Sequence, residues 1–220
     1  INCLLKAVSK NDSLKYIEDL LQFMYYDPRF KNPDYQKIAR LFYHTAKLKH
    51  QIKPFEYEAS RYEKNKTKIK IGFFCAEGLG TPTWNFLETI FQNLNKDKVE
   101  VYCYARHSQQ IFDGESQDLR RIKKAVHKWT YCNALSVKDT AILIYEDELD
   151  ILIDLSGYLP SYYGYYSNEP NMLIFMYKPA PVQITWYGFW GTTGISEIDY
   201  LITVEDNVPK SQDQYFTEKV

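Results

Sequence analysis

The chain begins with two stretches in which apolar residues recur at helical spacing. The first stretch has apolar residues at intervals of three or four positions: Leu14, Ile17, Leu20, Leu21 and Met24. This is the period of an amphipathic helix, and Asn11 to Ser13 supply residues that favour a helix start. The second stretch runs from Pro33, a residue typical of a first helical turn, to Ala46. Residues 1–50 are predicted to be helical, and one interpretation of the pair is the end of a helical repeat array.

From residue 68 the pattern changes to short apolar runs that alternate with helical stretches. Strands are predicted at 68–76, 99–105, 127–131, 150–155, 182–186 and 200–204, and helices at about 82–94, 115–126 and 136–147. Alternation of this kind predicts βαβ units and a mostly parallel sheet covered on both faces. We therefore expect an α/β protein with a Rossmann-like sheet over residues 67–220. A small α-helical segment and a polar linker precede it over residues 1–66.

Composition narrows the range of partners. The net charge is −1 and the pI about 6.5, so neither nucleic acid nor an anionic membrane is favoured. Cys75 and Cys103 lie in predicted strands, and the four cysteines form no CxxC pair, which predicts buried free thiols and a reducing compartment. The sequence shows neither a signal peptide nor a run of about 18 apolar residues. A soluble, cytoplasmic protein without a membrane span and without a metal site is predicted.

Ligands of such sheets bind outside the carboxyl ends of the strands, so the turns after Ala76, Leu155 and Trp186 are the candidate sites. The first turn reads EGLGTPT over residues 77–83, and a helix that begins there would expose free N–H groups to an anion or a polar ligand. A dinucleotide fingerprint fits this turn badly, because it lacks the third glycine and the acid after the second strand. An ordinary structural turn stays an open alternative.

The other two turns are rich in aromatic residues. The second leads from Leu155 to the tyrosines of 162–166, which could stack on a sugar or a peptide or could pack on one another. The third turn, residues 186–194, reads WYGFWGTTG. Its glycines permit close approach of a ligand to the backbone, and its aromatic rings suit the C–H faces of a sugar. Aromatic core packing explains this turn equally well.

Three runs of residues together resemble a known family. They are KPAPVQITWYG at 178–188, TTG at 192–194 and IDYLIT at 198–203. This pattern is similar to that of the O-GlcNAc transferase/SPINDLY protein glycosyltransferases, and the match extends over about residues 68–220. The tail from Tyr215 to Glu218 also resembles the bacterial N-glucosyltransferase branch of the same superfamily.

The resemblance implies the first lobe of a GT-B enzyme. Such enzymes are inverting and metal-independent, use no cofactor, and transfer GlcNAc, glucose or fucose from a nucleotide sugar to Ser/Thr or Asn of an acceptor protein. The donor expected here is a UDP-sugar, bound mainly by a C-terminal lobe outside this chain. The fragment alone is expected to be inactive.

Site residues follow from the family pattern. Glu77 falls on the family's acidic position and is the candidate proton acceptor, while Thr81 stands where the family has histidine. The donor sugar and acceptor are expected to be bound by Thr81, Pro82, Thr83, Tyr187, Gly188, Trp190, Thr192 and Thr193. Trp190 replaces a family proline. These replacements leave a second interpretation open, a non-catalytic member that binds a protein partner or glycopeptide as companion of an active transferase.

Overall fold

Six parallel strands form the centre of the molecule. The computed structural model describes residues 1–10, 13–58, 67–76, 82–106, 117–158 and 169–220. The strands are β1 (Ile69–Cys75), β2 (Val99–Ala105), β3 (Lys128–Tyr131), β4 (Ile151–Asp154), β5 (Val182–Trp186) and β6 (Tyr200–Ile202). All neighbours pair in parallel in the order β3-β2-β1-β4-β5-β6. The predicted α/β, Rossmann-like sheet is confirmed.

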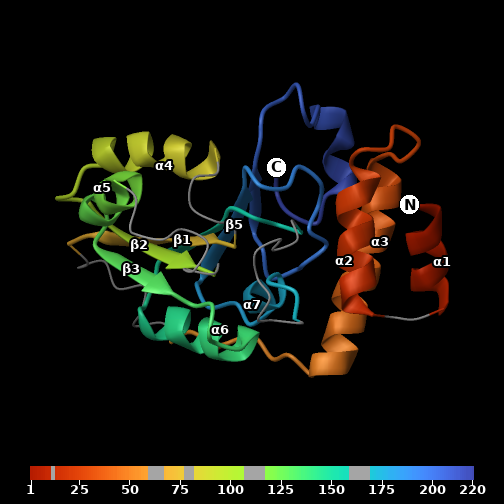
Figure 1. Cartoon of the computed structure of the whole chain (residues 1–220), viewed down its shortest axis with the longest axis horizontal. Coiled ribbons are helices and arrows are strands. Elements are labelled where there is room, and N and C mark those ends of the chain that lie inside the picture. The colour runs from red at the N-terminus through yellow and green to blue at the C-terminus, as the bar shows by residue number, and fades with distance from the viewer. Residues whose placement is uncertain (11–12, 59–66, 77–81, 107–116, 159–168) are drawn as a thin grey trace.

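Helices cover both faces of the sheet. In Figure 1, α4 (Pro82–Asn93) and α5 (Gln117–Ala125) lie on one side, and α6 (Val137–Glu146) and the short α7 (Leu173–Met176) lie on the other. Successive side chains of a strand point to opposite faces. Accordingly, Phe73 packs with Phe91 on the α4 side, whereas Phe74 packs with Phe175 on the α7 side. This double burial explains why the strand sequences are apolar almost throughout.

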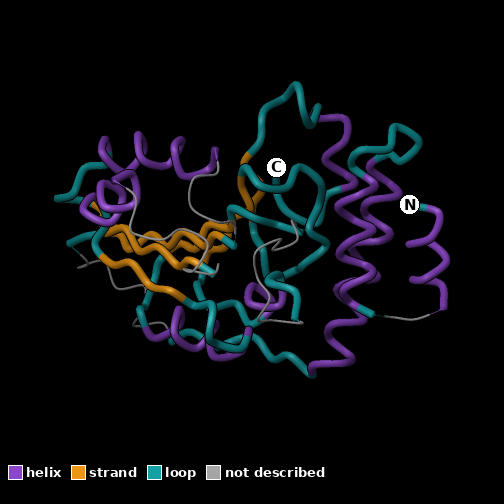
Figure 2. Tube along the Cα trace, viewed as in Figure 1, coloured by secondary structure: helices purple, strands orange, loops and turns teal. Residues whose placement is uncertain are grey.

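The N-terminal helices pack beside the sheet. They are α1 (Asn2–Lys10), α2 (Leu14–Met24) and α3 (Asn32–His50), which run side by side in Figures 1 and 2. Ile17 of α2 and Phe42 of α3 belong to the same buried cluster as Tyr158 and Ile198 of the sheet region. The helices therefore share one core with the lobe.

The linker and the cysteines also have defined places. Residues 51–58 form no regular secondary structure, and Phe55 packs against Tyr145 and Tyr177 at 4.5 and 6.0 Å between ring centroids. All four cysteines are free, and those of β1 and β2 are fully buried as predicted. In the described part of the chain, no helix is both long enough and apolar enough to cross a bilayer.

Candidate functional site

The strand order reverses between β1 and β4, and this position creates a crevice at the carboxyl edge of such a sheet. Ser156 ties the two strand ends together, because its Oγ accepts a hydrogen bond of 2.8 Å from the amide of Ala76. Residues 77–81 follow directly, so the predicted proton acceptor Glu77 and Thr81 lie outside the described residues. Pro82 is the first residue of α4 and Thr83 the second, as the turn sequence predicts.

A buried carboxylate organises the turn after β4. Asp154 is 1% exposed and accepts hydrogen bonds of 3.0 Å from the amides of Ser156 and Gly157 and from the Thr185 hydroxyl. Burial raises the pKa of Asp154, and these hydrogen bonds oppose that shift. Because Thr185 belongs to β5, the Asp154 carboxylate connects the turn after β4 to the neighbouring strand β5.

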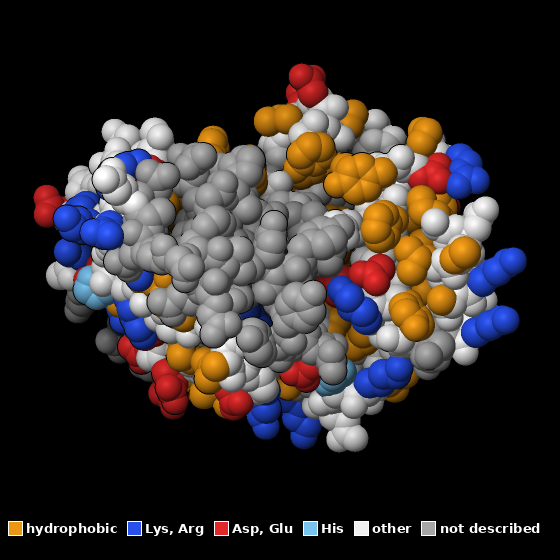
Figure 3. All heavy atoms as spheres, viewed as in Figure 1, with side chains coloured by type: hydrophobic (Ala, Val, Ile, Leu, Met, Phe, Trp, Pro, Cys, Tyr) orange, Lys and Arg blue, Asp and Glu red, His pale blue; other side chains and the backbone are white. Residues whose placement is uncertain are grey.

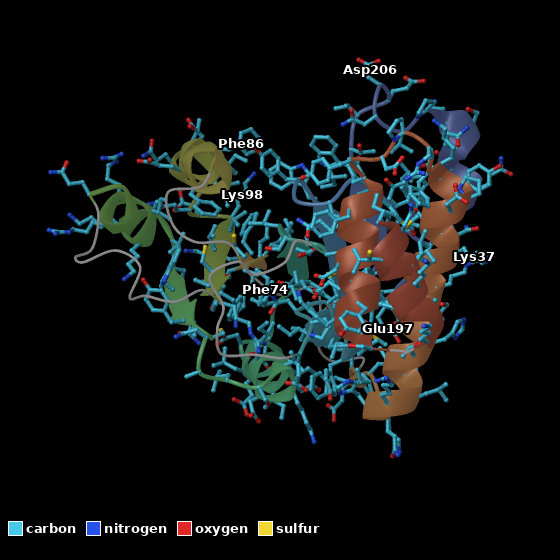
Figure 4. The ribbon with its side chains drawn as sticks, turned by 45° about the vertical axis from the view of Figure 1, so that its right-hand side comes forward. Lys37, Phe74, Phe86, Lys98, Glu197 and Asp206 are labelled. Carbon is cyan, nitrogen blue, oxygen red and sulfur yellow. The ribbon has the colours of Figure 1, made fainter. Side chains whose placement is uncertain are left out.

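The third turn is built by close approach of backbones. A Cβ on Gly188 would lie 2.0 Å from the carbonyl oxygen of Leu155, so only glycine fits there. Tyr187 has a φ of 72°, a left-handed conformation that is uncommon for a bulky residue. Its ring stacks on Phe86 of α4 with centroids 5.4 Å apart and planes 9° apart. Figure 4 shows Phe86 on the side of α4 that faces this turn. The contact places α4 against the predicted third turn.

Trp190 lies at the rim of the same turn. Half of its surface is exposed, and its Nε1 donates to the carbonyl of Tyr187 at 2.8 Å. Its indole also meets Tyr25 at the end of α2, edge to face, with ring centroids 5.5 Å apart. Tyr187, Gly188 and Trp190 are thus gathered at the carboxyl edge, where the sequence predicts contacts to sugar or acceptor.

Thr192 and Thr193 are placed differently. Both are buried, and both hydroxyls donate to the carboxylate of Glu218, which also accepts from the amide of Thr193 at 2.8 Å. The Tyr158 hydroxyl donates to the carbonyl of Thr193 at 2.5 Å. Their side chains therefore stabilise the turn from its buried side. They are not available to contact a ligand directly, and would affect one only by positioning the backbone of the turn.

Residues of the family-like segment between Lys178 and Asp199 also have a structural role. Lys178 Nζ lies 3.0 Å from both carboxylate oxygens of Asp199 and donates to the carbonyl of Glu197 at 2.9 Å. The buried amide of Gln183 donates to the carbonyls of Phe175 and Glu197. Glu197 in turn pairs with Lys47 of α3 at 2.9 Å, and Figure 4 shows it against the helical pair. These residues fix the connection between β5 and β6 against α3.

A small pocket opens between α2 and the third turn. Its volume is about 130 Å³. The lining consists of Gln22, Tyr25, Tyr26, Gly188, Phe189 and Trp190. Figure 3 shows hydrophobic side chains gathered over this end of the helical pair and the neighbouring C-terminal segment. Across the described ranges, no group of three or more His, Cys, Asp or Glu side chains could hold a metal ion.

Sequence reasoning missed several of these residues. Glu218 lies 25 residues beyond Thr193, and only the family likeness of the tail signalled it. Gln22 lies in α2, and Tyr25 directly follows this helix. The helix is predicted from its apolar stripe, in which a polar residue on the buried face gives little signal. Phe86 has the ordinary spacing of a core position on α4, yet it is 46% exposed beside Tyr187.

The fold and its carboxyl edge define a class, a Rossmann-like lobe of the GT-B type. A mutant O-GlcNAc transferase from Thermobaculum terrenum has the same fold, with a TM-score of 0.81 and 22% identity, covering 98% of this chain and 39% of that chain. The sequence profile of Glycosyl transferase family 41 matches residues 29–220. The chain belongs to glycosyl transferase family 41.

The chain is also similar to two curated peptide N-acetylglucosaminyltransferases. The probable UDP-N-acetylglucosamine–peptide N-acetylglucosaminyltransferase SEC of Arabidopsis thaliana is 30% identical over 172 residues, which are 77% of this chain and 16% of that protein. The UDP-N-acetylglucosamine–peptide N-acetylglucosaminyltransferase of Caenorhabditis elegans is 28% identical over 160 residues, 71% of this chain and 13% of that protein. The chain thus spans about one sixth or less of the length of these relatives.

Proposed function

We propose that this chain is the first lobe of a cytoplasmic, inverting, metal-independent protein glycosyltransferase. The full protein would transfer GlcNAc, glucose or fucose from a nucleotide sugar to Ser/Thr or Asn of an acceptor protein. Family membership over residues 29–220 is the observation that carries this proposal. The free, buried cysteines are consistent with a reducing compartment.

The proposal divides the binding of donor and acceptor between two lobes. The carboxyl edge of β1, β4 and β5 presents Tyr187, Gly188 and Trp190, which suit the sugar and acceptor side of a cleft. The nucleotide, a UDP-sugar as co-substrate in our proposal, would be held mainly by a C-terminal lobe outside this chain. A single lobe cannot close around the donor, so we expect the fragment alone to be inactive.

Inversion requires a base that takes the proton of the acceptor hydroxyl or amide. We assign this role to Glu77, which directly follows Ala76 at the end of β1. Thr81 and the first residues of α4, Pro82 and Thr83, would contact the sugar or the departing phosphate beside it.

The test is sugar transfer by the full-length protein. UDP-GlcNAc, UDP-glucose and GDP-fucose are offered with an acceptor protein, and product is followed by mass spectrometry. Glu77→Gln should lower kcat by about a hundredfold or more. Glu205→Gln, which removes an exposed carboxylate, serves as the matched control. Robust activity that Glu77→Gln leaves unchanged would remove Glu77 from this role.

The replacement of the family histidine by Thr81 favours a second candidate function. In that case the protein is a non-catalytic companion subunit that binds a protein partner or glycopeptide and supports an active transferase. It would then neither transfer nor hydrolyse any of the three donors alone, but would raise the activity or stability of a co-purified transferase. Turnover by the isolated full-length protein would decide against this alternative.

A further inference from the structure

A side chain takes over from the backbone pairing at the carboxyl end of β1. The amide of Leu155 donates to the carbonyl of Phe74, labelled in Figure 4, at 3.0 Å, which continues the parallel pairing of β4 with β1. The amide of Ala76, two residues further on, donates instead to the Oγ of Ser156 at 2.8 Å. Ala76 is 2% exposed and Ser156 1%. Loss of this hydroxyl would therefore leave a buried N–H group without its acceptor, which is unfavourable.

The turn that carries Ser156 is packed closely against the third turn. A Cβ on Gly188 would lie 2.0 Å from the carbonyl oxygen of Leu155. Gly157 has a φ of 55°, and a Cβ there would lie 2.2 Å from the Cβ of Phe189. Backbone at residues 155–157 thus contacts the third turn, while the side chain between these contacts reaches β1. Ser156 therefore connects the end of β1 to the third turn.

Asp154 holds Ser156 in this position. Its carboxylate accepts hydrogen bonds of 3.0 Å from the amides of Ser156 and Gly157 and from the hydroxyl of Thr185 on β5. Hydrogen bonds to an ionised group are stronger than those between neutral groups, and a buried network with all its members paired has one defined geometry. Two buried side chains, Asp154 and Ser156, thus link the ends of β5, β4 and β1.

Ala76 is joined directly to the proposed proton acceptor. One peptide bond leads from Ala76 to Glu77, and this bond sets the two Cα atoms about 3.8 Å apart. A general base has to lie within hydrogen-bond reach of the proton that it takes, and a misplacement of about 1 Å can lower the rate on the order of a hundredfold. Whatever fixes the amide of Ala76 therefore affects where Glu77 begins.

We propose that Ser156 is a positioning residue, which fixes the start of the first turn, and with it Glu77, relative to the third turn. Ser156 is enclosed in the core and acts only through its hydrogen bond to Ala76. The inference rests on the proposed function, because it takes Glu77 as the base. It deepens that function by naming a residue that acts through this base.

Hydrogen exchange of the full-length protein tests the contact itself. Ser156→Ala removes the acceptor, so the amide of Ala76 should exchange about tenfold faster, measured on peptides that span the end of β1. Ser136→Ala is the matched control. It removes the N-cap of α6, which accepts from the amide of Asp139 at 3.0 Å, and should leave exchange at Ala76 unchanged. Equal exchange at Ala76 in the wild type and in Ser156→Ala would overturn the proposal.

Transfer kinetics of the full-length protein test the action through Glu77. The donor is the one of UDP-GlcNAc, UDP-glucose and GDP-fucose that the wild type turns over fastest. Ser156→Ala should lower kcat about tenfold and keep the KM for the donor within about twofold, whereas Ser136→Ala should change neither. In a Glu77→Gln background, Ser156→Ala should lower kcat by less than about twofold, because the group through which it acts is already lost.

The two measurements separate this inference from the function on which it rests. An equal loss of kcat in both backgrounds would make Ser156 a purely structural residue and overturn the proposal, and so would a kcat that Ser156→Ala leaves unchanged. Activity that Glu77→Gln leaves unchanged would overturn the proposal together with the role of Glu77. If no donor is turned over but Ser156→Ala accelerates exchange at Ala76, the transferase function fails and the anchoring of the first turn stands.

Discussion

Glu218 is a single side chain on which the conformation of the third turn depends. Its carboxylate collects hydrogen bonds from the hydroxyls of Thr192 and Thr193 and from one amide, all of them buried. The third turn thus depends on a residue beyond β6 for its shape. Thr192 and Thr193 follow Tyr187, Gly188 and Trp190 in the same turn, so this anchor supports the segment that carries them.

Replacement of Glu218 should therefore destabilise the protein. Glu218→Ala leaves three buried donors without their acceptor, and we expect a loss of roughly 3 kcal/mol in the free energy of unfolding. Glu218→Gln keeps one acceptor oxygen and should cost less. Urea denaturation measures both, with the exposed Glu205→Gln as control. A midpoint for Glu218→Ala equal to that of the control would show that the cluster contributes nothing to stability.

Glu18 on α2 makes stability depend on pH. Burial raises the pKa of this carboxyl from 4.5 to about 7, although the neighbouring Lys15 opposes the shift. The folded protein therefore binds more protons than the unfolded chain between pH 4.5 and about 7. The free energy of unfolding should fall by about 3 kcal/mol as the pH rises through this window, and then stay constant with respect to this group.

Glu18→Gln tests this dependence. The variant should lack the decline, and at pH 8 it should be more stable than the wild type, because no charge has to be buried. Unfolding curves at pH 5 and pH 8 give the comparison, and the exposed Glu146→Gln is the matched control. The expectation would be contradicted if the free energy of unfolding of the wild type rose from pH 5 to pH 8 while that of Glu18→Gln stayed the same. Ionisation of Glu18 would then not destabilise the folded protein.

At the scale of elements, the third turn and α3 are fitted to each other. Gly194 has a φ of 69°, and a Cβ there would lie 2.6 Å from the backbone carbonyl carbon of Ala39 and 2.8 Å from its Cβ. Together with the Lys47–Glu197 ion pair, this contact locks the N-terminal helices onto the connection between β5 and β6. The position of α3 is thus fixed relative to the third turn.

A methyl group at Gly194 should separate these elements. Gly194→Ala combines an unfavourable backbone conformation with overpacking, and we expect a loss of about 2–3 kcal/mol in the free energy of unfolding. Gly191→Ala is the control, because its Cβ would meet side chains rather than backbone, the ring of Phe189 at 3.1 Å and that of Tyr35 at 3.7 Å. Equal melting temperatures for the two variants would contradict the tight fit of the turn against α3.

Most elements follow from periodicity in the sequence. The predicted strands at 99–105 and 182–186 match β2 and β5 exactly in range, and Ser136 caps α6 by accepting from the amide of Asp139 at 3.0 Å. The strand predicted at 200–204 ends at Ile202, and the helices α7 and η3 (Lys210–Tyr215) were not predicted. These two are only one or two turns long, too short for a helical period to show.

At the scale of the whole molecule, the site is harder to predict than the fold. The motif around Gly188 predicts a position at the carboxyl edge of the sheet, where strand ends in a parallel sheet converge. It does not indicate that Thr192 and Thr193 point inward, because their partner Glu218 is remote in sequence. Nor does it indicate that Gln22 and Trp190 line one pocket, which depends on how the end of α2 packs against the turn after β5.

The same edge also limits what this chain can do by itself. The described lobe offers aromatic and small residues beside β5, and the lining of its pocket carries no charge. A nucleoside diphosphate needs cationic or backbone N–H partners on several sides.

We therefore expect the isolated fragment to bind UDP and GDP with a Kd weaker than about 1 mM, and the full-length protein to bind one of them much more tightly. Isothermal titration of both proteins makes the comparison, with circular dichroism to confirm that the fragment is folded. Tight binding by the folded fragment would contradict the division into two lobes, because it would place the nucleotide site within residues 1–220.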